Sequence, residues 1–196
     1  MKPLLNELKR YSPVDSTPLV VCPNRCIQQH KVFDGVAARG KTSMGWFLGF
    51  KLHLVVNDQG ELLACQLTPG NIDDRVPVPI LSKRLYGKLF GDRGSVSRPL
   101  FEQLWQDFQV QLITKLRKNM KNRLMTISDK LLLRKRALIE TIIDQLKNIP
   151  QIEHSRHRSP INFVVNVLAR LIANCLQPKK PALQFVNELN AIVSYP

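Results

Sequence analysis

The sequence predicts an α/β fold in which helices flank one mixed sheet. Strand patterns come first along the chain, helices and strands then alternate, and long helices come last, an order typical of a sheet layer covered by helices. The chain has 196 residues, of which 44% are hydrophobic, so one packed core is expected. We expect a leader at 1–12, one folded domain at 13–177 and a tail at 178–196.

The clearest strand pattern lies at residues 46–57. Apolar side chains there recur at every second position, with Gly, Lys and His between them, which is the period of a half-buried strand. A turn of Asp, Gln and Gly follows, so residues 62–68 are expected to return as the partner of a hairpin. Residues 14–22 predict an earlier strand broken by Pro18, and the polar segment 23–45 predicts a loop or hairpin.

The second half of the chain alternates short strands with helices. Prolines stand near the predicted helix starts, where a missing N–H costs little, and Ile149-Pro150 ends the longest pattern. Ser128 is positioned to cap that long helix. The predicted segments are a helix at 74–85, a strand at 88–91, a helix at 97–107, a strand at 110–114, a helix at 129–147 and a helix at 160–176.

The charge composition predicts a polyanionic partner. The chain carries 29 Lys and Arg against 15 Asp and Glu, a formal net charge of +14. Basic side chains gain affinity for phosphates by releasing counterions, so nucleic acid is the leading expectation, ahead of a membrane surface or an acidic protein. The longest apolar stretch, 161–176, is interrupted by Asn and Arg and is too short to span a bilayer, and the first ten residues lack the features of a signal peptide.

Cysteine usage predicts reduced thiols in a cytoplasmic protein. The chain has four cysteines. Cys22 and Cys26 lie near His30, but no second pair of ligands follows at the spacing of a zinc finger. We therefore expect neither structural zinc nor a disulfide framework.

Three well-separated acids predict a metal site. Asp15 lies in the middle of a predicted strand, where a charged side chain needs a partner. Asp92 lies where a strand meets a Gly turn, at the edge where open α/β sheets hold their sites. Glu140 lies on the predicted helix 129–147. Carboxylates are the ligands that Mg²⁺ and Mn²⁺ prefer, and two such ions can clamp both oxygens of a phosphoryl transfer.

The spacing on helix 129–147 supports Glu140 as the third acid. Arg136 comes four residues before it and Lys147 seven after, steps of about 400° and about 700°, so the three share one helix face to within roughly 60°. Cations beside a metal-binding carboxylate are suited to hold a DNA strand. A plain Arg136–Glu140 surface pair is the alternative, and Asp144 is the rival ligand.

On these residues the chain resembles the DDE transposases of bacterial insertion sequences. The resemblance extends over about 13–181, and Leu133 stands where the last of the family's motifs has Tyr. The matching motifs are Asp-Ser-Thr at 15–17, Gly-Phe-Lys-Leu-His at 49–53, Pro-Gly-Asn-x-x-Asp at 69–74, Gly-Asp-Arg-Gly at 91–94, and the spacing of Arg136, Glu140 and Lys147.

The resemblance implies a ribonuclease H-like fold and a DNA transposase that cleaves and joins strands at element ends. Asp15, Asp92 and Glu140 would hold two Mg²⁺ or Mn²⁺ ions. It also implies a homodimer or larger assembly on element and target DNA, in the cytoplasm and associated with the bacterial nucleoid, with no membrane partner. The expected DNA-binding residues are Arg136, Lys147, Lys51 and the basic run Lys115, Arg117, Lys118, Lys121 and Arg123.

Several alternatives stay open at this point. The resemblance implies that intact relatives carry a longer N-terminal region, whereas Met1 precedes Asp15 by only 14 residues here. A truncated remnant that binds DNA without sequence preference is therefore the second hypothesis. An RNA-binding structural protein is a third, weakened by an aromatic content of 7%. Lys51 and His53 share one strand face, and for Lys51 an ordinary exposed face fits as well as a phosphate contact. Asp73 and Asp74 are interpreted as turn and helix-cap residues.

Overall fold

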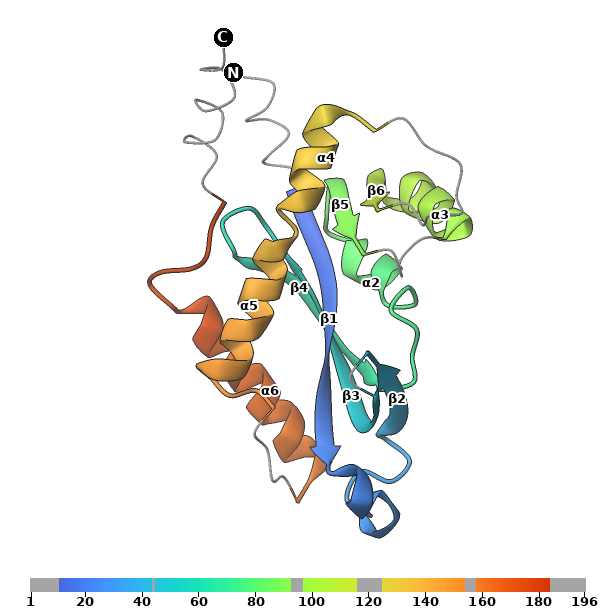
Figure 1. Ribbon diagram of the computed structural model, residues 1–196, viewed down its shortest axis with the longest axis vertical. Helices are drawn as coiled ribbons and strands as arrows, with labels where there is room; N and C mark the ends of the chain where they lie inside the picture. Colours follow the sequence, from blue (N-terminus) through green and yellow to red (C-terminus); the bar gives the residue numbers. More distant parts are fainter. Residues whose placement is uncertain (1–10, 44, 93–96, 116–124, 154–157, 184–196) are drawn as a thin grey trace.

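The computed structural model describes residues 11–43, 45–92, 97–115, 125–153 and 158–183. They form a curled six-stranded mixed sheet with helices on both sides (Figure 1), which confirms the predicted α/β class and is compatible with a ribonuclease H-like fold. The strands are β1 (Tyr11–Cys22), β2 (Ala38–Thr42), β3 (Gly45–Val56), β4 (Leu62–Pro69), β5 (Gly87–Gly91) and β6 (Val110–Thr114).

Two long strands form the centre of the sheet. β1 and β3 pair antiparallel, and the other edge of β3 pairs with β2 along its first half and with β4 along its second. β5 joins the start of β1 in parallel, and β6 joins β5 in parallel. The antiparallel pairing of β3 and β4 confirms the expected hairpin. The hairpin could be predicted because its alternation and its turn are both local in sequence.

β1 begins at Tyr11, three residues before the expected start, and continues through Pro18 without a break. β5 pairs with β1 only over 11–13, so among the described strands β1 has β3 on one side and an open edge on the other at Pro18. A missing N–H at an open edge breaks no ladder bond, which explains why the strand tolerates this proline.

The expected long helix at 129–147 is two helices, α4 (Ile127–Arg134) and α5 (Ala137–Asn148). Between them the hydrogen bonds tighten to the i to i+3 pattern, from the Leu138 N–H to the Lys135 carbonyl (3.0 Å) and from the Ile139 N–H to the Arg136 carbonyl (3.1 Å). The Thr126 hydroxyl, not that of Ser128, caps α4 by accepting the Asp129 N–H at 3.2 Å.

The helix expected at 74–85 is shorter than its pattern suggested. Only α2 (Val78–Ser82) is helical, because an Asp73–Arg75 turn and Pro77 precede it. The segment 23–45 holds a 3₁₀ helix, η1 (Asn24–Gln29), and then the hairpin strand β2. Two other helices lie close to their expected places: α3 (Arg98–Phe108), capped by Ser97, and α6 (Pro160–Cys175).

Each face of the sheet has its own apolar core. α5 and α6 cover one face, where Phe50 of β3 stacks on Phe163 of α6 with ring centroids 5.0 Å apart. α2 and α3 cover the other, where Val55 and Leu104 are fully buried. Among the described helices, none combines the length and the apolar character needed to cross a bilayer. Asp15 is the only ionisable carboxylate on β1, and it is partly buried between these layers.

Candidate functional site

Strand register brings Asp15 and Asp92 side by side. In the parallel pair of β1 and β5, Pro13 lies opposite Phe90. Two residues further along each chain are Asp15 and Asp92, so both carboxylates come at the same level of the sheet. Asp92 directly follows Gly91, the last residue of β5. Parallel pairing therefore places at one edge two acids that are 77 positions apart in sequence.

α5 supplies the third acid from above the sheet. Its apolar side, which includes Ile139 and Ile142, is buried against the core. Glu140 lies in the first turn of α5 on the opposite side, and its side chain is 62% exposed. A carboxylate is stabilised near a helix N-terminus by the unpaired N–H groups there.

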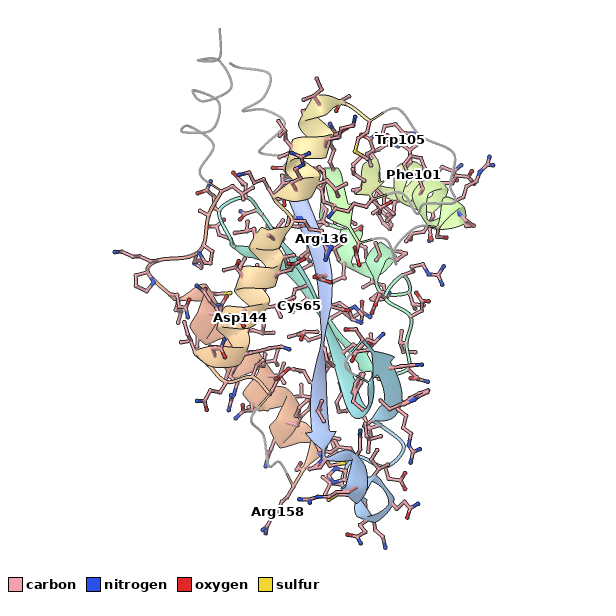
Figure 2. All side chains as sticks on the ribbon, viewed as in Figure 1. Cys65, Phe101, Trp105, Arg136, Asp144 and Arg158 are labelled. Carbon is pink, nitrogen blue, oxygen red and sulfur yellow. The ribbon has the colours of Figure 1, made fainter. Side chains whose placement is uncertain are left out.

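Arg136 contacts all three acids. Its Nη2 lies 2.7 Å from Oδ2 of Asp15 and 3.8 Å from Oε1 of Glu140, and its Nη1 lies 3.4 Å from Oδ1 of Asp92. Figure 2 shows Arg136 at the junction of α4 and α5, beside β1. Arg136 lies in the tight turn between α4 and α5. From there its guanidinium reaches β1, the end of β5 and the first turn of α5. We call these four residues the acid cluster.

The electrostatics of the acid cluster favour a bound cation. The Arg136 side chain is only 12% exposed. Burial lowers its pKa and is the largest single effect, but the charge and hydrogen bond of Asp15, followed by the charges of Asp92 and Glu140, together raise it above its ordinary value. Three carboxylates around one guanidinium leave a formal charge of −2, which attracts further positive charge.

The inner side of the acid cluster is buried, and the Asp15 carboxylate is fixed there. Oδ1 of Asp15 accepts the Ser16 N–H at 2.9 Å, which fixes the carboxylate while Oδ2 faces Arg136. Nε of Arg136 and the hydroxyl of Tyr11 are both buried without a hydrogen-bond partner among the described residues. Leu133, at the position where the family signature has Tyr, is buried in the core. The cluster is therefore tightly packed on its inner side and open at Asp92 and Glu140.

The donor chemistry of the acid cluster fits a hard divalent ion. Within the described residues no three His, Cys, Asp or Glu side chains lie close enough together to share a metal. Asp15, Asp92 and Glu140 instead share a guanidinium, which occupies the place of a cation between oxygen donors of the type that Mg²⁺ and Mn²⁺ prefer. Asp144, the rival ligand, is exposed and is not among the acids that contact Arg136.

The expected DNA-binding cations have varied surroundings. Lys147 pairs with Glu153 at 2.7 Å. Lys51, with its side chain 14% exposed, donates to the Ile72 carbonyl at 2.9 Å and to Asp74 at 3.1 Å. Lys115 is exposed just after β6. The rest of the basic run, Arg117, Lys118, Lys121 and Arg123, lies outside the described residues.

A second polar network was missed by the sequence reasoning. Asp73 forms the expected turn, but Asp74 caps no helix: its Oδ1 accepts from Ser16 Oγ at 3.0 Å as well as from Lys51. His53, expected on an exposed face, is 2% exposed, and its Nε2 lies 2.9 Å from Thr68 Oγ1.

This network has a structural role, because it holds two segments of the chain together. Burial lowers the pKa of His53 to about 4, although Asp74, with Oδ1 4.0 Å from Nδ1, opposes the shift. The network joins the Gly-Phe-Lys-Leu-His strand to the Pro-Gly-Asn-x-x-Asp segment, so two motifs of the resemblance contact each other. The presence of both motifs in the sequence was the signal from which this contact could have been predicted.

Of three comparisons with known proteins, the one against family profiles found a match. The profile of the family described as transposase DDE domain matches residues 6–160, which includes Asp15, Asp92, Arg136 and Glu140. Neither a search of curated proteins nor one of solved structures found a match. The match covers most of the chain and all four residues of the acid cluster, and the protein therefore belongs to the transposase DDE domain family.

Proposed function

We propose that this protein is a metal-dependent DNA transposase that cleaves and joins DNA strands at the ends of an insertion sequence. The observation that carries the proposal is the convergence of Asp15, Asp92 and Glu140, from two strands and a helix, on one guanidinium. The family membership implies DNA binding, and the net charge of +14 suits a DNA substrate.

The three carboxylates would hold two Mg²⁺ or Mn²⁺ ions. Bound ions of this kind activate a water or a 3′-hydroxyl as nucleophile and stabilise the leaving oxygen of the phosphodiester. The protein's own contribution is placement. Asp15 is fixed by the Ser16 N–H, whereas Asp92 and Glu140, each 62% exposed, face the solvent from which DNA would approach.

Arg136 has two roles in this proposal. Without DNA, it neutralises part of the charge that three neighbouring carboxylates accumulate. Once other cations balance the carboxylates, its guanidinium is released and can donate two parallel hydrogen bonds to a DNA phosphate, for which its planar fork is well shaped. Arg136 would thus position the strand that is cut.

The other expected contacts surround this position. Exposed Lys115, at the start of the basic run, is suited to bind the DNA backbone, while Lys51 and Lys147 would have to leave Asp74 and Glu153 before doing so. We also propose a homodimer or larger assembly on paired element ends and a cytoplasmic, nucleoid-associated location. Both follow from the family's chemistry on DNA.

Nicking of supercoiled plasmid tests the proposal. Purified protein with Mn²⁺ is expected to nick the plasmid, and Asp92→Asn is expected to abolish nicking while DNA binding persists. Asp144→Asn, one turn beyond Glu140 on α5, is the matched control and should nick like the wild type. EDTA should stop the reaction in every sample. Equal nicking by Asp92→Asn would refute the site, and binding without nicking by the wild type would favour a DNA-binding remnant.

A further inference from the structure

The helix α6 has an apolar face that nothing in the described structure covers. Its inner side, with Phe163, Val167 and Leu171, is buried beside α5. Its outer side, together with the C-cap residue Leu176, carries six large apolar side chains that are exposed by 42–78% of their surface. A helix that is apolar on both sides is typical of one buried between two partners. The exposed residues are Ile161, Val164, Val165, Leu168, Ile172 and Leu176.

Their spacing forms a continuous stripe. Ile161, Val165, Leu168 and Ile172 follow each other at intervals of four, three and four residues, the spacing of a coiled-coil seam. At 100° per residue, this stripe lies roughly 135° around the helix from the buried one. α6 therefore presents a seam suited to another helix on the side that faces away from the core.

The stripe is free of charge in a strongly basic protein. Arg170 is the only charged residue of α6, and its guanidinium is bound to the carbonyls of Pro150 and Gln151 and to the side chain of Asn166. Like charges across a symmetric contact repel, so a chain of net charge +14 can pair with its copy most easily where charge is absent. The outer side of α6 meets this condition.

We propose that the outer side of α6 is the surface through which two copies of this chain pair, with their α6 helices antiparallel. The four–three–four spacing is the same in both directions along the helix. A twofold axis between Asn166 and Val167 therefore places Ile161 of one copy against Ile172 of the other, and Val165 against Leu168. The self-complementarity of the spacing favours a second copy over an unrelated partner.

The area is sufficient for a specific contact. Six large apolar side chains bury on the order of 100 Å² each, or about 600 Å² per copy and about 1,200 Å² in total, the lower end of specific interfaces. The family match ends at Pro160, the first residue of α6, so the pairing surface lies beyond the matched residues.

The pairing surface rests on the homodimer expected under the proposed function. Pairing through α6 does not depend on DNA cleavage, so an experiment can refute one proposal without refuting the other.

Sedimentation equilibrium of the full chain without DNA, in high salt, tests the pairing. The wild type is expected to dimerise at micromolar concentration. Val165→Glu or Leu168→Lys alone places a like charge from each copy in the seam and should weaken dimerisation by about 30-fold or more. Ile127→Glu, at an exposed apolar position on α4, is the matched control and should dimerise like the wild type.

The double variant Val165→Glu/Leu168→Lys tests the register. Antiparallel pairing brings each introduced Glu opposite an introduced Lys, so the double variant should dimerise more strongly than either single variant. Circular dichroism of each protein confirms folding. A monomeric wild type, dimerisation of the single variants equal to the wild type, or a double variant as weak as the single ones would overturn the proposal.

Discussion

Replacement of Arg136 by Met should destabilise the metal-free protein and strengthen its binding of Mn²⁺. The substitution keeps an unbranched apolar stem and removes the only guanidinium that contacts Asp15, Asp92 and Glu140 among the described residues. Breaking a buried ion pair costs about 3–5 kcal/mol, but Asp92 and Glu140 are exposed and screened by solvent, so we expect a loss of about 2 kcal/mol. For a chain of this length, that loss lowers Tm by about 4–8 °C.

The same interaction sets the expected change in metal affinity. In the wild type, a bound cation competes with Arg136 for the three carboxylates, whereas in Arg136→Met it does not. A difference of about 2 kcal/mol corresponds to about 30-fold tighter Mn²⁺ binding by the variant. At saturating Mn²⁺ the metal contributes more stability to the variant, so the gap in Tm between the two proteins should close.

Thermal unfolding in EDTA and in Mn²⁺ measures both effects. Arg98→Met is the matched control, because Arg98 forms an exposed pair with Glu102 on α3 that contributes little, and its Tm should shift by less than about 2 °C. An unchanged Tm of Arg136→Met in EDTA, or a gap that persists in saturating Mn²⁺, would show that Arg136 does not occupy the place of a metal ion.

Two further predictions concern stability. The pKa of buried His53 is lowered from 6.5 to about 4, so the unfolded chain binds the extra proton first as pH falls. Stability should therefore be full above pH 6.5 and decline by about 3 kcal/mol towards pH 4, and urea titrations of His53→Gln should lack this decline. Thr126→Ala should cost about 1 kcal/mol through loss of the α4 cap, whereas Ser128→Ala should be nearly neutral in the same assay. Equal losses for the two alanine variants would contradict the assigned cap.

The elements that the sequence predicted well are those whose signals are local. The alternation in β3, the turn before β4 and the short strand β6 each depend on neighbouring residues, and the structure has them at or within a residue or two of the expected bounds. The division between α4 and α5 could not be predicted in this way. Helical periodicity runs through Arg136, and the turn there accompanies contacts with Asp15, 121 positions away in sequence.

Burial was predicted less well than strand position. The two-residue period in β3 suggested one solvated face, but His53 and Val55 are both buried because the segment after β4 and the helix α2 cover that face. The helical pattern after Asp74 predicts that this residue caps a helix. Its actual partners, Ser16 and Lys51, lie on two strands far away in sequence, and propensity carries no information about such contacts.

The role of Asp15, Asp92 and Glu140 as metal ligands stays a prediction, and only part of their arrangement could be predicted from local patterns. Asp15, Asp92 and Glu140 belong to separate sequence motifs, and the structure brings all three within reach of one side chain. The spacing of four residues correctly indicated that Arg136 neighbours Glu140. The contacts of Arg136 with Asp15 and Asp92 could not be predicted from this spacing. Those contacts depend on the parallel register of β1 and β5, which no local pattern specifies.

Electron paramagnetic resonance can show whether Asp15, Asp92 and Glu140 hold a metal, because it detects Mn²⁺ binding without requiring DNA or turnover. We expect the wild type and Asp144→Asn to bind Mn²⁺ alike and Asp92→Asn to lose most of this binding. Equal Mn²⁺ binding by Asp92→Asn and the wild type, or none by the wild type at millimolar Mn²⁺, would contradict the claim that the acid cluster is a metal site.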